Sequence, residues 1–389
     1  MGYNRALYTT VMLKGSRAAV ETMLLPSFPA IAIAMHTTKH WIQLSVTAYI
    51  VGLLFAKLFV SHFADNSGPR RALLVMLPFM LAGALLSLIP DVTLFITGRL
   101  LQGFGLGGTT SLSITILKYT YDREAFKEKL AMLDALTAWT PAIAAVAGGI
   151  IQFYLDWQTN LFFIAALAII LLFSTARLLP AQRVQKIPRA NSEKSIIKFQ
   201  QLLTKPLFLM YSVIYSLLIS GQSVFYILLP FIMISEWRMK PYEFSLSLAA
   251  LYFGNFGGML TSAQLQKYYS HLRIIFLSLC ITSISIFFLA VAYILKLDMI
   301  FLTILSLLIY GFGSALTLPA IEVNVSGILP NSPSTATAIL GLVLAVITIL
   351  TTVVVIHLPG NSFTVMTLFL GSLVMLCWIA LIFCRKFAE

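Results

Sequence analysis

Charged residues are the scarcest class in this sequence. Only 10% of the 389 residues are Asp, Glu, Lys or Arg, whereas 59% are hydrophobic. Soluble domains carry roughly 25% charged residues, and a soluble chain of this length could not cover its surface with so few. The composition therefore excludes an ordinary soluble protein and indicates one that is surrounded by lipid.

Residues that form disulfides or bind metals are few and scattered. The three cysteines, Cys280, Cys377 and Cys384, stand singly in apolar runs, so neither a disulfide framework nor a zinc site is expected. The five histidines fall at the ends of such runs, and the sequence contains no G-x-x-x-x-G-K loop of the kind that holds ATP. We therefore expect no metal, no cofactor, no enzymatic reaction and no direct drive by ATP.

Long hydrophobic runs are what the sequence does contain. A membrane-spanning helix needs about 20 mainly apolar residues, and the period of alternation that marks a membrane β-barrel is absent. We predict an all-α integral membrane protein with twelve transmembrane helices, near residues 8–35, 41–63, 72–90, 92–118, 130–153, 158–177, 206–234, 244–265, 273–295, 299–326, 335–357 and 362–384.

The basic residues are distributed unevenly about these spans. The net charge of +12 would suit a nucleic-acid partner, but eighteen of the 26 basic residues fall on the side of both termini and four on the other. Such a bias marks the cytoplasmic side. We therefore predict a multi-pass protein of the cell inner (cytoplasmic) membrane, with both termini cytoplasmic and no nucleic-acid partner. The first apolar run lacks a small-residue cleavage motif, so no signal peptide is expected.

One long polar joint divides the twelve spans into two sets of six. It covers residues 178–205, and the segment Leu101-Gln102-Gly103-Phe104-Gly105 before it resembles Ile309-Tyr310-Gly311-Phe312-Gly313 after it. Duplicated six-helix halves are typical of transporters whose site lies near the midplane of the bilayer. We predict an N-terminal half (1–177), a cytoplasmic linker (178–205) and a C-terminal half (206–389).

Three motifs resemble those of the major facilitator superfamily. The joint Ser61–Arg71, which contains Asp65 and Gly68, resembles the superfamily's loop signature G-x-L-A-D-R-x-G-R-K. The segment Leu94–Gly105, with Arg99 and Gln102, resembles L-x-x-x-R-x-x-Q-G-x-G, and Pro141 with Gly148-Gly149 resembles the antiporter motif G-P-x-x-G-G. Leu25-Pro26-Ser27-Phe28-Pro29 and Thr335-Ala336-Thr337-Ala338 add a resemblance to the Bcr/CflA type of drug:proton antiporter.

The resemblance implies two pseudo-symmetric six-helix halves and transport by alternating access. Gly68 would allow the tight turn after the second span. A conformational latch is expected at the cytoplasmic face, from Asp65 with Arg70, Arg71 and the region of Asp122; the alternative is that the arginines only anchor the spans. Pro141, Gly148 and Gly149 would bend the fifth span or let a helix approach closely, as small residues do in any membrane bundle.

Ionisable residues within spans indicate a solute pathway, because a charge in the bilayer is costly. Lys14, Arg17 and Glu21 share one face of the first span. Glu21 is the candidate proton carrier; the alternative is a static ion pair with Arg17, and relatives place their acid at the position of Thr22. The resemblance implies that Arg99 tunes protonation, and a purely structural hydrogen-bonding role is the alternative. Lys57 faces the pathway or snorkels, and Asp134 and Glu322 lie nearer the cytoplasmic ends.

The excess of basic groups bears on the substrate. Lys14, Arg17, Lys57 and Arg99 face one central acid, Glu21, which favours an anionic or zwitterionic solute such as a carboxylate metabolite or siderophore. Thr22 and Gln102 extend this predicted substrate site. The seventh span adds candidates for stacking and hydrogen bonding, with ordinary helix packing as the alternative for each: Tyr211, Tyr215, Gln222 and Tyr226.

We expect a monomeric, proton-coupled exporter of a small organic molecule. A multidrug pump for neutral or cationic drugs and an uptake carrier for organic anions remain the alternatives.

The predicted orientation can be tested by cysteine labelling of intact cells, in a background without the native cysteines. We expect a membrane-impermeant maleimide to label Lys39→Cys and Lys240→Cys but not Lys186→Cys, because the first two positions are predicted to be outside. Labelling of position 186 would show that the orientation is reversed.

Overall fold

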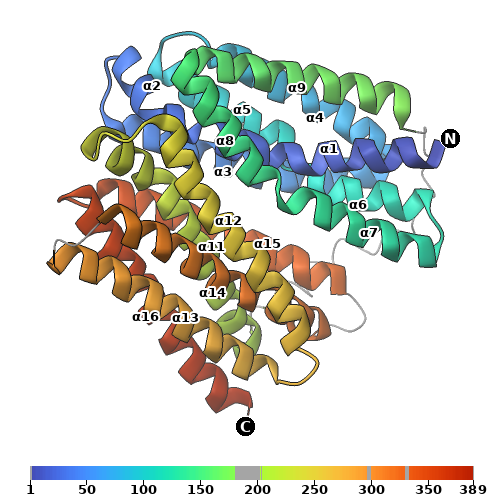
Figure 1. Ribbon diagram of the computed structural model, residues 1–389. Coiled ribbons are helices and arrows are strands. Elements are labelled where there is room, and N and C mark those ends of the chain that lie inside the picture. Colours follow the sequence, from blue (N-terminus) through green and yellow to red (C-terminus); the bar gives the residue numbers. More distant parts are fainter. Residues whose placement is uncertain (1, 180–201, 203, 296–298, 329–332, 389) are drawn as a thin grey trace. The chain divides into compact units, whose positions relative to one another are not determined.

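The computed structural model describes residues 2–179, 202, 204–295, 299–328 and 333–388 (Figure 1). All regular elements within these ranges are helices. They are α1 (Gly2–Met23), η1 (Leu25–Ser27), α2 (Phe28–Ala34), α3 (Lys39–Ser67), α4 (Pro69–Leu86), α5 (Val92–Leu106), α6 (Thr109–Thr120), α7 (Arg123–Ala138), α8 (Thr140–Tyr154), α9 (Trp157–Leu178), α11 (Pro206–Pro230), η2 (Phe231–Glu236), α12 (Pro241–Leu265), α13 (His271–Leu295), α14 (Met299–Ile328), α15 (Pro333–His357) and α16 (Ser362–Ala388).

The described helices confirm the predicted spans. Eleven segments are long and apolar enough to cross a membrane, judged by length and composition. The remaining prediction, 244–265, lies within α12, a 25-residue helix. The largest boundary errors are at the starts of the first and fifth spans, where helix begins at Gly2 and Arg123 rather than near residues 8 and 130. Charged residues at these helix ends made the apolar runs look shorter than the helices.

Several spans are interrupted at glycine, proline or aromatic residues. The first span changes to 3-10 helix at Leu25–Ser27, next to Pro26. The fourth breaks between α5 and α6 at Gly107 and Gly108, and the fifth breaks between α7 and α8 at Trp139, just before Pro141. Proline lacks an N–H and crowds the preceding turn, which explains the first and third of these breaks.

The chain divides into two compact units. Unit 1 comprises Met1–Pro188 and Arg238–Ser245, and unit 2 comprises Arg189–Trp237 and Leu246–Glu389. The predicted linker, 178–205, falls largely outside the described residues, so its boundaries stay a prediction. In unit 1, α1 packs against α5, α6, α7, α8 and α9. In unit 2, α11 packs against α14, α15 and α16.

The duplicated glycine segment has the same packing role in both units. A Cβ atom on Gly103 would lie 2.1 Å from the carbonyl oxygen of Tyr49 on α3, and one on Gly311 would lie 2.1 Å from that of Leu251 on α12. The next glycines, Gly105 and Gly313, lie against α4 and α13 in the same way. Backbones in such close contact leave room for glycine alone, so the repeated sequence reflects a repeated helix seam.

Gly148 lies at a third close contact, between α8 and α1. Its added Cβ atom would lie 2.0 Å from the carbonyl oxygen of Met23. We predict that Gly148→Ala destabilises the protein by about 1–3 kcal/mol, the usual cost of overpacking, measured as a lower unfolding temperature in detergent. Gly327→Ala is the matched control, because nothing lies within 4 Å of that added Cβ atom. Equal unfolding temperatures for the two variants would contradict the prediction.

Candidate functional site

Arg99 on α5 is a fully buried cation with uncharged partners. Its side chain is 1% exposed. One terminal nitrogen donates to the Val20 carbonyl (3.2 Å) and to Oε1 of Gln102 (2.8 Å), and the guanidinium lies 4.6 Å from the centre of the Tyr49 ring. Its Nε atom has no hydrogen-bond partner. A carbonyl, an amide and an aromatic face thus compensate part of its charge.

The partners of Arg99 tie four helices of unit 1 together. The Tyr49 hydroxyl donates to the Arg17 carbonyl (2.9 Å), which joins α3 to α1. The Gln102 amide donates to the Ser87 hydroxyl (3.3 Å), which follows the last residue of α4. The α5 motif therefore holds its arginine against α1 through a network of neutral groups.

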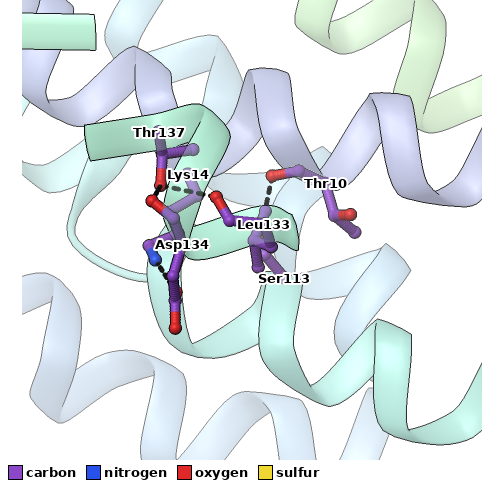
Figure 2. Close-up of polar contacts among 6 residues, drawn as sticks. All are labelled: Thr10, Lys14, Ser113, Leu133, Asp134 and Thr137. Carbon is purple, nitrogen blue, oxygen red and sulfur yellow. Dashed lines mark hydrogen bonds and ion pairs between the residues drawn. The ribbon is translucent and has the colours of Figure 1, made fainter. Parts of the chain in front are cut away.

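The charged stripe of α1, formed by Lys14, Arg17 and Glu21, contacts α7 at Lys14, the member nearest the N-terminus. Lys14 forms an ion pair with Asp134, drawn as a dashed line in Figure 2. Lys14 therefore has an acidic partner of its own and does not belong to the surplus of cations expected around Glu21. The partner could not be predicted because Lys14 and Asp134 are 120 residues apart in the sequence, and no local spacing indicates their contact.

The other members of the stripe have no such partner. Arg17 and Glu21 are half-buried and form no ion pair among the residues that the structure describes, and Nε of Arg17 is buried without a hydrogen bond. The static Arg17–Glu21 pair considered as an alternative is therefore absent. Glu21 lies within electrostatic range of Tyr49 and Arg99.

Two neighbouring predictions concern Thr22 and Lys57. The Thr22 hydroxyl donates to the carbonyls of Ala18 and Pro141, both at 3.0 Å, so it bridges α1 and α8. Lys57 on α3 is half-buried, has no ion pair within the described part of the chain, and lies within electrostatic range of Arg17. Lys57 is thus a third cation of unit 1, after Arg99 and Arg17, without an ion pair among the described residues.

The helix-bend residues lie where the fifth span meets other backbone. Pro141 stands in the first turn of α8, after the break at Trp139, and its carbonyl receives the Thr22 hydrogen bond. Gly148 lies against Met23, and a Cβ atom on Gly149 would lie 2.2 Å from the Ser245 hydroxyl. These glycines permit close packing in unit 1.

The predicted latch residues lie in different surroundings. Gly68, which precedes α4, has φ +84°, a positive value that glycine adopts readily. Arg70 donates to the carbonyls of Thr175 (3.2 Å) and Ala176 (2.6 Å) near the end of α9, whereas Arg71 is exposed. Asp122 accepts from the Ala125 N–H and caps α7. The Asp65 side chain lies outside the described residues, so the latch stays a prediction.

In unit 2 the predicted α11 residues form a polar seam with α12 and α14. The Tyr215 hydroxyl donates to Glu322 (2.7 Å), the Gln222 amide donates to Asn255 and Ser314 (both 3.1 Å), and Tyr252 donates to Tyr226 (2.9 Å). Tyr211 is buried with its ring edge-on to His271, at 5.7 Å. Asn255, Ser314 and Tyr252 were not predicted, since single polar residues in apolar runs carry no positional signal.

Comparisons with known proteins agree with this arrangement. The sequence profile of the Major Facilitator Superfamily matches residues 15–352. The multidrug resistance protein MdtL of Salmonella paratyphi C is 31% identical over 175 residues, 44% of each chain. MdtL of Salmonella typhimurium is 32% identical, with the same coverage. The matched stretch thus spans less than half of the length of these relatives.

Solved transporters have the same fold. The nucleoside transporter NupG superposes with a TM-score of 0.76 at 16% identity, covering 99% of this chain and 100% of that one. The xylose transporter XylE from E. coli, in an inward open conformation, gives 0.74 at 13% identity, with 100% and 95% covered. At such low identity the likeness concerns the fold alone.

Proposed function

Because the chain belongs to the Major Facilitator Superfamily and is therefore a membrane transporter, we propose that it exports a small anionic or zwitterionic organic molecule in exchange for protons. Both termini are cytoplasmic in this proposal, the membrane is the inner one, and the protein works as a monomer. A carboxylate metabolite or siderophore is the kind of solute that fits.

The excess of cations in unit 1 is the observation that supports this proposal. Arg17, Lys57 and Arg99 form no ion pair with a carboxylate among the described residues, although all three lie in helices long and apolar enough to span a membrane. A lipid-facing charge at a helix centre costs about 2.5–3.5 kcal/mol on insertion scales, so these cations face protein or water. An anionic group on a solute would supply the missing partner.

Proton coupling is assigned to Glu21. This carboxylate is half-buried, is not held in an ion pair, and lies within electrostatic range of Arg99. Desolvation favours the protonated form of such an acid and a nearby cation favours the ionised form. A solute that binds beside Arg17 would change this balance, and solute binding would thereby be linked to the protonation state of Glu21.

A specific observation favours a second candidate function. The relatives that match over 175 residues are named multidrug resistance proteins, so efflux of neutral or cationic drugs is the runner-up. The excess of cations in unit 1 argues against lipophilic cations as the preferred solutes, because like charges repel most strongly at low dielectric. Uptake of organic anions would use the same charges in the opposite direction.

Replacement of Glu21 tests the coupling. We expect Glu21→Gln to abolish transport driven by a pH gradient in proteoliposomes while solute binding survives, since glutamine resembles the protonated acid and cannot release a proton. Nalidixate, chloramphenicol and tetraphenylphosphonium serve as anionic, neutral and cationic probes. Glu128→Gln, an exposed acid on α7, is the control. Unchanged gradient-driven transport in Glu21→Gln would remove Glu21 from this role.

Replacement of Arg17 tests the sign of the substrate. We predict that Arg17→Ala lowers nalidixate transport about tenfold or more, because a hydrogen bond to a charged group contributes roughly 1.5–3 kcal/mol, and chloramphenicol transport about twofold or less. Equal losses for both probes would indicate that Arg17 supports the fold alone. A preference of the unmodified protein for tetraphenylphosphonium would favour the multidrug candidate.

A further inference from the structure

The Lys14–Asp134 ion pair differs from the other two ion pairs in the described part of the chain. Those two, Lys127–Glu124 and Lys129–Glu128, lie within α7, whereas Lys14–Asp134 joins α7 to α1. Its acid was given no role above. The distance within the Lys14–Asp134 pair therefore depends on how α1 and α7 pack, whereas the distances within the other two pairs depend on α7 alone.

The groups around this pair leave it free to exchange partners. Figure 2 shows that the neighbouring hydroxyls bond to backbone: Ser113 donates to the Thr10 carbonyl (3.2 Å), and Thr137 to the carbonyls of Leu133 (2.8 Å) and Asp134 (3.4 Å). They do not hold the ammonium or the carboxylate. An ammonium has three donors, and the structure assigns those of Lys14 a single acceptor residue, Asp134.

The pair is also accessible. The side chains of Lys14 and Asp134 are 20% and 53% exposed. A carboxylate that faced acyl chains would be costly, so its exposed face lies towards water. Exposed ion pairs contribute little to stability, and a second anion can therefore compete for the lysine.

Arg17 provides a second contact for such an anion. It lies three residues after Lys14 on α1, and side chains at this spacing are neighbours on a helix surface. Its Nε atom is buried and lacks a partner. A solute carboxylate could therefore bind Lys14 and Arg17 together, whereas Asp134 bonds Lys14 alone.

Apolar packing holds α7 against α1 beside this pair. Leu7 on α1 and Leu133 on α7 belong to one buried cluster, against which Val11 and Leu130 are packed. Loss of the Lys14–Asp134 ion pair would therefore leave the two helices in contact, and the exchange concerns the partner of Lys14 alone.

We propose that Asp134 forms an ion pair with Lys14 when no solute is bound. The carboxylate of an anionic solute displaces Asp134 and binds Lys14 and Arg17. This inference rests on the anionic substrate proposed above and adds a specificity-determining residue to it. The internal carboxylate acts as a competitor that only another anion replaces.

Binding measurements on the purified full chain test the exchange. Removal of the competitor in Asp134→Asn should tighten nalidixate binding about two- to fivefold, the range expected from loss of a weak ion pair, and leave chloramphenicol binding unchanged. Lys14→Gln should weaken nalidixate binding about tenfold. In the double variant, nalidixate affinity should equal that of Lys14→Gln. Glu124→Gln, which removes an α7 acid paired within its own helix, should change neither.

The outcomes separate this proposal from the function on which it rests. Nalidixate binding that is unchanged or weaker in Asp134→Asn would overturn the exchange, while the anionic substrate class would stand. Absence of nalidixate binding by the unmodified protein, with chloramphenicol bound, would overturn the substrate class and the exchange together.

Discussion

A guanidinium buried among apolar helices dominates the organisation of unit 1. Arg99 cannot be solvated by lipid, and the described structure supplies it with a carbonyl, an amide and a tyrosine ring rather than a carboxylate. Each of these groups compensates part of a charge, so several must meet at one point. Meeting there requires α1, α3 and α5 to approach closely, and the other features of this unit follow from that requirement.

Glycine makes this approach possible. Gly103 and Gly52 let α3 and α5 touch backbone to backbone, and the carbonyl that contacts Gly103 belongs to Tyr49, whose ring faces Arg99. The glycine contact and the Arg99 site therefore depend on the same residue of α3, Tyr49. Unit 2 has the same close helix contact at Gly254 and Gly311 but without a buried arginine among its described residues. The two units therefore share this packing and differ in their polar groups.

The sequence predicted those features that depend on composition along one helix. The helical spans follow from apolar runs of sufficient length, and Gly68 at a positive φ follows from the turn that it must make. Features that depend on two distant helices could not be predicted. The partner of Lys14 lies 120 residues away, and Gln222 bonds to Asn255 and Ser314 because α11 packs against two other helices. The register between two helices depends on how they pack, and no local sequence pattern indicates it.

The charges of unit 1 differ in how firmly they are held, and this difference suits a transporter. Removing a partner from a buried, hydrogen-bonded charge costs several kcal/mol, so Arg99 and its neutral partners keep the helices in place. Half-exposed pairs such as Lys14–Asp134 contribute about 0.2–1 kcal/mol, and Arg17 and Glu21 have no ionic partner in the described structure. Binding of a solute or a proton can redistribute these weak interactions but cannot displace the strong ones. A transporter needs both, because a site that rearranges at low cost must be built on helices that do not come apart.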